Sequence, residues 1–214
     1  MNKMICFDLD GTLWDTAEST YKAVNNYLKL HGYFFRVDLE TIAVNMGNEF
    51  EVCAKNYFPN LEIEEACNVL RETFVFHNEM LKDGRCSGDV YEGVFSTLEE
   101  LSKKYVLCIV SNCANEIYIE NFLKIAGVQD YIKDSIPASK YPISKGEAIQ
   151  RLKEKYSVEE AIYVGDTSKD QQASEEAGCQ FIHAKYGFGK NVSADYIIDS
   201  FSDLLDLVPK IFKE

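Results

Sequence analysis

The sequence of 214 residues predicts an α/β fold: a core with a parallel sheet that carries an inserted, smaller all-helical domain. Two patterns support this prediction. From about residue 90, short apolar runs alternate with helical segments of about ten to fifteen residues, as in βαβ units around a parallel sheet. From residue 15 to about residue 82, only helical periodicity is found. We therefore expect a core formed by residues 1–14 and 88–214, and a helical insertion at residues 15–87.

The first strand is expected at residues 3–7, because this run is apolar, precedes a turn and is too short for a helix. Three helices are expected in the insertion. Their apolar positions recur every three or four residues, and the first helix meets a stop signal at His31-Gly32. They cover residues 21–28, 49–57 and 62–81. The aromatic residues expected to pack between them are Trp14, Tyr21, Tyr27, Phe50, Phe74 and Phe76.

The second part of the chain is expected to alternate between helices and strands up to a final helix. One helix begins at Ser144, with Glu147 at the spacing of a capping box. The expected helices are 93–104, 115–127, 144–156 and 168–178. The expected strands are 105–110, 131–136, 161–166, 179–184 and 195–199.

The composition, 46% hydrophobic and 27% charged, is typical of a globular protein, and no apolar run approaches the roughly 18 residues of a membrane span. The N-terminus reaches Asp8 without the apolar segment of a signal peptide. Seven scattered cysteines, none in a C-x-x-C pair, indicate free thiols in a reducing compartment. We expect a cytoplasmic protein, with a monomer as the default. The net charge of −13 argues against a nucleic-acid-binding surface.

Polar residues follow several of the expected strands. Asp8-Leu9-Asp10-Gly11 follows the first, Ser111-Asn112 follows the second, and Asp166 ends the strand at 161–166, with Asp170 four residues later. Lys145 stands at the start of a helix. Ligands of open α/β sheets bind beyond the carboxyl ends of the strands. If the sheet is parallel, all of these residues lie at one edge.

Four aspartates at one edge cannot all be ionised without a counter-charge, and Mg²⁺ prefers such oxygen ligands. With a cation present, Asp8 can attack phosphorus as a nucleophile. Asp10 can protonate the leaving oxygen and then activate water. The backbone of the Gly11 turn, the Ser111-Asn112 segment and the Lys145 ammonium are expected to hold the phosphoryl oxygens.

The order "DLDGT", strand-Ser-Asn, lysine, "GDTSKD" resembles the four motifs of the haloacid dehalogenase-like superfamily, and the insertion resembles its C1 helical cap. "YEGV", "GDTSKDQQASEEAG" and "AKYGFG" resemble the phosphoglycolate-phosphatase-like branch. The resemblance implies a Rossmann-like core with an inserted helical cap domain, a magnesium cofactor and an aspartyl-phosphate on Asp8. It also implies metal ligation by Asp8, by Asp10 through its backbone carbonyl and by Asp166, with support from Asp170.

The lysine of this pattern has two candidates. Lys140 precedes Tyr-Pro, whereas Lys145 begins a helix. We favour Lys145, because a helix N-terminus also offers free N–H groups to an anion.

A Mg²⁺-dependent phosphatase acting on a small phosphorylated metabolite is the leading functional hypothesis. The alternatives are a β-phosphoglucomutase-like phosphomutase, a dehalogenase and a non-catalytic phosphate-binding protein. The three histidines are expected to be structural. The segment 187–190, "GFGK", lacks the P-loop pattern and is expected to border the site. Residues 44–49, "VNMGNE", are expected to influence substrate specificity.

Overall fold

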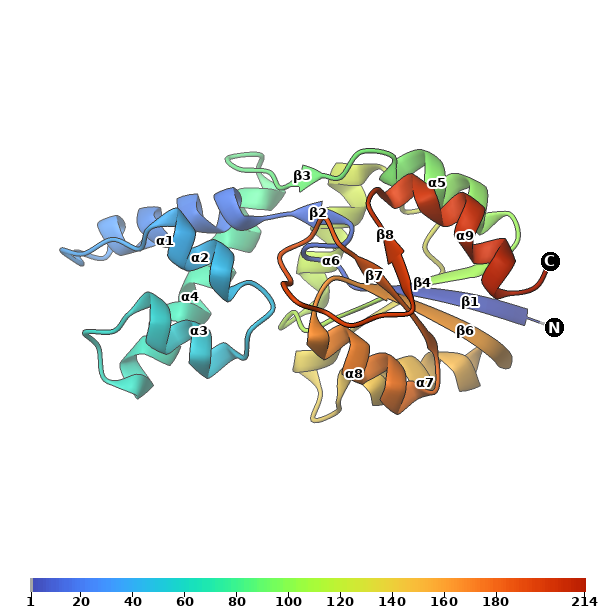
Figure 1. The fold of residues 1–214 in the computed structure, drawn as a ribbon. Coiled ribbons are helices and arrows are strands. Elements are labelled where there is room, and N and C mark those ends of the chain that lie inside the picture. The colour runs from blue at the N-terminus through green and yellow to red at the C-terminus, as the bar shows by residue number, and fades with distance from the viewer. Residues whose placement is uncertain (1) are drawn as a thin grey trace. The chain divides into compact units, whose positions relative to one another are not determined.

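The computed structural model describes residues 2–214, which form two compact units (Figure 1). The first unit comprises the chain up to Trp14 together with Val90–Glu214, and the second is Asp15–Asp89. The boundaries fall in two short strands, β2 (Trp14–Asp15) and β3 (Asp89–Val90), which pair with each other. Among the described residues, no helix is long and apolar enough to cross a membrane.

The first unit contains a parallel sheet of six strands in the order β5-β4-β1-β6-β7-β8. β1 lies in its middle: Phe7 is in register with Ile109 on one side and with Val164 on the other. A strand covered on both faces is a continuous apolar run, as "MICF" is. This confirms the predicted fold class. The bounds are β1 Asn2–Phe7, β4 Val106–Ser111, β5 Asp134–Pro137, β6 Val158–Gly165, β7 Gln180–Ala184 and β8 Tyr196–Ile198.

Helices cover both faces of this sheet. In Figure 1, α5 (Val94–Ser102) and α9 (Leu204–Ile211) lie on one face, and α7 (Lys145–Lys155) and α8 (Ser168–Ala177) lie on the other. The crossover from β4 to β5 runs through α6 (Glu116–Ala126). Two short 3-10 helices, η1 (Ala138–Lys140) and η2 (Phe201–Asp203), complete the unit. The apolar faces of α7 and α8 pack against the sheet through Ala148, Ile149, Leu152, Ala173 and Ala177.

Side-chain caps fix where two of these helices begin, directly beside the carboxyl edge of the sheet. Ser144 Oγ accepts the Glu147 N–H at 2.9 Å, but the Glu147 carboxylate pairs with Arg151, so only half of the predicted capping box forms there. A complete capping box is instead found at the start of α8, between Thr167 and Asp170. The caps fix where α7 and α8 begin, and hence where Lys145 and Asp170 stand.

The second unit is helical, with α1 (Ala17–Leu30), α2 (Leu39–Asn45), α3 (Phe50–Tyr57) and α4 (Ile63–Lys82). The sequence reading missed α2, because seven residues are too few to show a helical period. Its start signal is nevertheless present, since Asp38 accepts the Thr41 N–H at 2.7 Å. The core of this unit is formed by residues such as Val24, Leu28, Ile42, Ala54, Phe58, Ala66 and Leu70.

The structure describes two regions that the sequence analysis singled out, Trp14 and the segment 44–49. The ring of Trp14, expected to pack between the inserted helices, lies 5.4 Å from the ring of Tyr118 and 5.2 Å from that of Phe122, both on α6 (centroid distances). The segment 44–49 is organised by Asn45, whose Oδ1 accepts hydrogen bonds from the side-chain amides of Asn48 and Asn56. Its predicted influence on specificity stays a prediction.

Candidate active site

The carboxyl edge of the sheet brings together residues that lie far apart in the sequence. Asp8, Ser111 and Asp166 each stand at the end of a strand, on β1, β4 and β6 respectively, and all three are buried. The Asp8 N–H donates to the Val164 carbonyl at 2.8 Å, which continues the β1–β6 ladder up to the acidic residue. The edge position of these groups follows from the parallel pairing of their strands.

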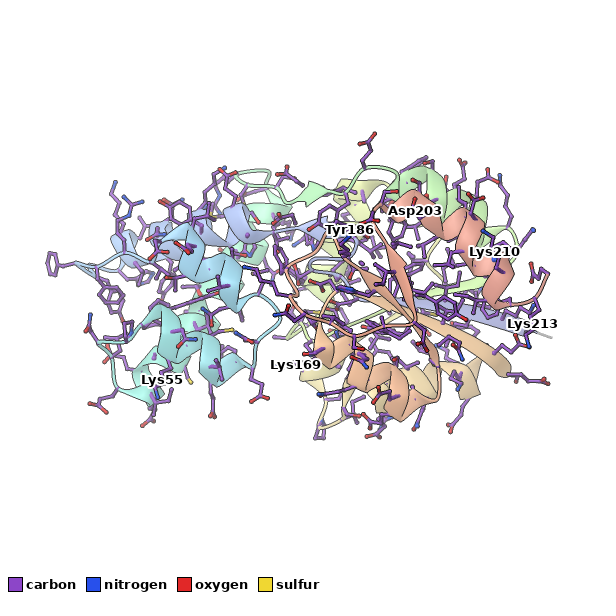
Figure 2. The ribbon with its side chains drawn as sticks, in the orientation of Figure 1. Lys55, Lys169, Tyr186, Asp203, Lys210 and Lys213 are labelled. Atoms are coloured by element: carbon purple, nitrogen blue, oxygen red, sulfur yellow. The ribbon has the colours of Figure 1, made fainter. Side chains whose placement is uncertain are left out.

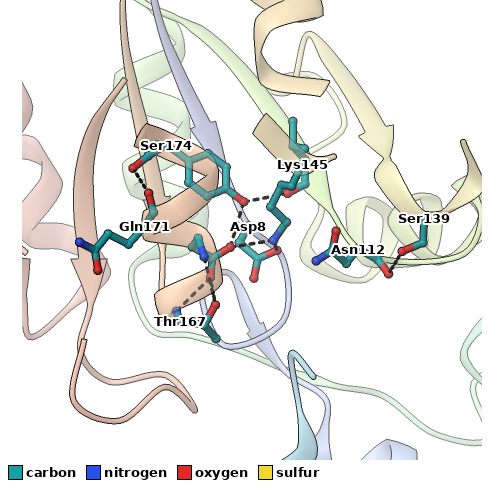
Figure 3. Close-up of polar contacts among 10 residues, drawn as sticks. Asp8, Asn112, Ser139, Lys145, Thr167, Gln171 and Ser174 are labelled. Atoms are coloured by element: carbon teal, nitrogen blue, oxygen red, sulfur yellow. Dashed lines mark hydrogen bonds and ion pairs between the residues drawn. The ribbon is translucent and has the colours of Figure 1, made fainter. Parts of the chain in front are cut away.

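Lys145 joins two of the acids. Its Nζ lies 2.9 Å from Asp8 Oδ1 and 2.7 Å from Asp170 Oδ1, and Figure 3 shows Lys145 directed at Asp8. The three side chains are only 8%, 10% and 1% exposed, so water screens these ion pairs little. Lys140 instead pairs with Glu116 at the surface. Of the two candidate lysines, the fold therefore places Lys145 against Asp8.

Burial perturbs every charge in this group. It raises the pKa of Asp8 well above the usual range, Lys145 opposes the rise, and the neighbouring carboxylates add to it. Burial also raises the pKa of Asp166, to about 7, with Asp170 contributing. For Asp170 burial acts in the same direction, but Lys145 and Thr167 outweigh it and hold its pKa below the usual value. The pKa of Lys145 is raised although burial opposes this, because Asp170 and Asp8 favour its charged form.

The residues present fit a divalent cation. Ligand oxygens of Asp8, Asp166 and Asp170 all lie within 4.8 Å of one another, and all three residues are buried. Among the described residues, Asp166 Oδ1 is buried and has no hydrogen-bond partner. A buried carboxylate oxygen without a donor is costly unless a cation or a proton satisfies it. Asp10 is not part of this cluster.

A glycine-rich loop after β7 fixes Asp166. Its other oxygen, Oδ2, accepts the N–H groups of Phe188 at 2.7 Å and Gly189 at 3.1 Å. A Cβ on Gly189 would lie 1.9 Å from the Asp166 carbonyl oxygen, and one on Gly187 would lie 2.3 Å from the carbonyl oxygen of Gly11. Only backbone without side chains fits so closely. The loop thus borders the site, as predicted.

The turn after Asp10 lies against the same carboxylate. Gly11 has a φ of +81°, and a Cβ there would meet Asp166 Oδ2 at 2.3 Å, so glycine is required both for conformation and for space. Its N–H donates to the Trp14 carbonyl at 2.9 Å. The hydroxyl of Tyr186, a residue labelled in Figure 2, donates to the Thr12 carbonyl at 2.8 Å and thereby connects the loop to the turn. The Gly11 N–H, expected to bind phosphate, is used within the turn.

The segment after β4 contains the remaining predicted residues. Ser111 is buried, whereas Asn112 is exposed, and its carbonyl accepts the Ser139 hydroxyl at 2.8 Å (Figure 3). The next residue, Cys113, was not singled out from the sequence. The pKa of its thiol is raised to about 12, mainly by burial and also by the Asp10 charge, although a hydrogen bond with Ser111 opposes the rise. Cys113 is therefore a neutral thiol beside the acids.

Two tyrosines at the site were also missed. Tyr118 donates to Asp10 Oδ1 at 2.7 Å, and Tyr163 donates to the Val110 carbonyl at 2.9 Å while lying 3.3 Å from Asp170 Oδ1. A tyrosine in an apolar strand or on an amphipathic helix has the pattern of a core residue. Only the position of Tyr118 in the first turn of α6, after a strand that ends at the site, could have drawn attention to it.

Comparison with known proteins agrees with this geometry. Residues 5–184 match the family described as haloacid dehalogenase-like hydrolase. Proteins named phosphoglycolate phosphatase from Photobacterium profundum and Vibrio parahaemolyticus are 26% and 28% identical; the alignments cover 96% of this chain and 95% and 96% of theirs.

Solved structures share the fold. A predicted phosphoglycolate phosphatase from Haemophilus somnus superposes with a TM-score of 0.83 at 24% identity, over 97% of this chain and 98% of the other. A subfamily IA hydrolase of the haloacid dehalogenase superfamily from Geobacter sulfurreducens gives 0.73 at 19% identity, over 97% and 96%. Because the family match extends over residues 5–184, most of its length, this chain belongs to the haloacid dehalogenase-like hydrolase family.

Proposed function

We propose that this hydrolase is a Mg²⁺-dependent phosphatase that acts on small phosphomonoesters through an aspartyl-phosphate on Asp8. The observation that carries the proposal is the buried ammonium of Lys145 between Asp8 and Asp170. Beside them lies an Asp166 oxygen that has no hydrogen-bond donor in the described part of the chain. Such a site accumulates negative charge that only a cation can balance when a phosphate enters. That is the requirement of phosphoryl transfer.

The positions of the residues support the role that we propose for each. Asp8 is the proposed nucleophile. It accepts a hydrogen bond from Lys145, whose charge opposes the rise in the pKa of Asp8 that burial causes. Asp8, Asp166 and the backbone carbonyl of Asp10 are the proposed Mg²⁺ ligands, with Asp170 in support. When bound, Mg²⁺ would neutralise phosphoryl charge and lower the cost of attack by an anion.

The phosphoryl oxygens require donors. We assign the Ser111 hydroxyl, the Asn112 backbone and the Lys145 ammonium to this task, because all three lie at the carboxyl edge of the sheet. Asp10 is the proposed general acid and base. The helical unit, Asp15–Asp89, is proposed to be the cap domain of the family.

Phosphoglycolate is the proposed first substrate to test, because the relatives that align over nearly the whole chain carry the name phosphoglycolate phosphatase. We propose a cytoplasmic enzyme that acts as a monomer on a free phosphorylated metabolite. The net charge of −13 disfavours a nucleic-acid substrate.

The test is phosphate release from a panel of phosphomonoesters that includes phosphoglycolate, with Mg²⁺ and with a chelator. Asp8→Asn keeps the shape of the side chain but removes the nucleophile, and Asp206→Asn on the exposed side of α9 is the matched control. We expect Mg²⁺-dependent release by the wild type and by Asp206→Asn, and none by Asp8→Asn. Formation of an isomeric phosphate ester without free phosphate would instead indicate a phosphomutase.

A further inference from the structure

Tyr118 contacts the residue to which the proposed mechanism assigns proton transfer. Its hydroxyl donates to Asp10 Oδ1 at 2.7 Å, a length typical of a hydrogen bond from a hydroxyl to a carboxylate. The two residues are 108 positions apart in the sequence, and the parallel pairing of β1 with β4 brings them together. The contact is therefore a product of the fold and not of a local turn.

The tyrosine ring is held from several sides. Its face is tilted against Trp14, with the ring centroids 5.4 Å apart, and the fully buried Trp14 also packs edge-on against Phe122 at 5.2 Å. The backbone of Tyr118 is fixed as well, because its N–H donates to the capping side chain of Asn115. A hydroxyl fixed in this way defines the orientation of the carboxylate that accepts from it.

We propose that Tyr118 is the positioning residue for the general acid and base: it anchors Asp10 Oδ1 and thereby presents Oδ2 to the reacting oxygen. This inference rests on the proposed phosphatase function. Tyr118 itself transfers no proton and does not contact the phosphoryl group.

In the proposed mechanism Asp10 loses a proton in the first step and regains one in the second. As the Asp8 oxygen forms its bond to phosphorus, the bond from phosphorus to the leaving oxygen breaks, and that oxygen receives the proton from Asp10 Oδ2. In the second step, Oδ2 takes a proton from water while the water oxygen bonds to phosphorus. The bond between phosphorus and Asp8 breaks, phosphate leaves, and Asp10 is protonated again. A rotated Asp10 would impair both transfers.

Two substrates with different leaving groups distinguish a residue that positions the general acid from one that only supports the fold. An alkoxide leaving group, as in phosphoglycolate, needs protonation, whereas p-nitrophenolate leaves without it. The parameter kcat/KM reports the steps up to departure of the leaving group, so it isolates the first proton transfer. We therefore compare kcat/KM for phosphoglycolate and p-nitrophenyl phosphate in the wild type, Tyr118→Phe and Asp10→Asn.

Tyr118→Phe removes one oxygen atom and keeps the ring. We expect kcat/KM for phosphoglycolate to fall about 10- to 100-fold, and kcat/KM for p-nitrophenyl phosphate to stay within about twofold of the wild type. Asp10→Asn should show the same selectivity with a larger loss. Tyr131→Phe is the matched control, because it also removes a phenol that donates to a carboxylate, that of Glu99, but away from the site.

An equal loss for both substrates, or no loss for either, would overturn the positioning role, since neither reports on protonation of the leaving group. The proposed function fails differently: the wild type would then release no phosphate from either ester, or Asp8→Asn would remain active. Selective loss in Asp10→Asn without selective loss in Tyr118→Phe would leave the phosphatase standing and reject Tyr118 as its positioning residue.

Discussion

Replacing Lys145 by methionine tests the electrostatics of the site most directly. Methionine keeps an unbranched chain of similar length but removes the ammonium. Asp8 and Asp170 would then share a buried site without the charge that now lies 2.9 Å and 2.7 Å from their oxygens. Two carboxylates in this arrangement cannot both remain ionised at low cost.

The size of the effect follows from burial. The side chains of Lys145, Asp8 and Asp170 are 8%, 10% and 1% exposed, so solvent screening reduces their interaction little. Removing one partner of a buried ion pair costs about 3 to 5 kcal/mol, mainly because the other charge is left buried and unpaired. We expect Lys145→Met to lower the free energy of unfolding at pH 7 by an amount in this range.

The measurement is urea unfolding in the presence of a chelator, so that no cation replaces the ammonium. Lys155→Met is the control, because Lys155 also pairs with an aspartate, Asp134, but is 61% exposed. We expect little change in this control. The difference in the free energy of unfolding between the wild type and Lys145→Met should also be smaller at pH 5 than at pH 7. Without the ammonium the pKa values of Asp8 and Asp170 rise in the folded state, so the folded variant binds protons first and gains relative stability as the pH falls.

A deficit below about 1 kcal/mol at pH 7 would refute this reasoning, since it would show that the pair contributes no more than a surface salt bridge. A deficit of equal size at pH 5 and pH 7 would contradict it as well, because it would assign the loss to packing and not to charge.

Two further predictions concern pH. Burial lowers the pKa of His77 from 6.5 to about 4, so the unfolded chain binds a proton at a higher pH than the folded protein does. Between pH 7 and pH 4 the free energy of unfolding of the wild type should therefore fall by about 3 kcal/mol more than that of His77→Gln, as measured by urea unfolding. A wild type whose stability falls no more than that of the variant would contradict this. The pKa of Asp166 is about 7, so below pH 7 a bound Mg²⁺ must displace a proton from this carboxylate. We expect the affinity for Mg²⁺ to fall up to tenfold for each pH unit below 7. Calorimetric titration at pH 6 and pH 8 measures this, and equal affinities would refute the prediction.

Much of the fold could be predicted because its signals are local. The apolar run before Asp8, the glycine stop signals and the alternation after residue 90 each require only neighbouring residues to be read. The start of α8 at Ser168 and its end before Gly178 agree with this reading. Where the local signal was short, as in α2, the prediction failed.

The sequence by itself determined that Asp8, Ser111 and Asp166 would share one edge, because the carboxyl ends of parallel strands always meet. Only the tertiary structure decided which atoms meet there. It placed Lys145, and not Lys140, against Asp8, and it brought Tyr118 to Asp10. It also left Asp166 Oδ1 without a donor among residues 2–214. The physical reason is that the position of each strand along the chain depends on a local pattern, whereas the direction of a side chain depends on packing between segments that are remote in the sequence.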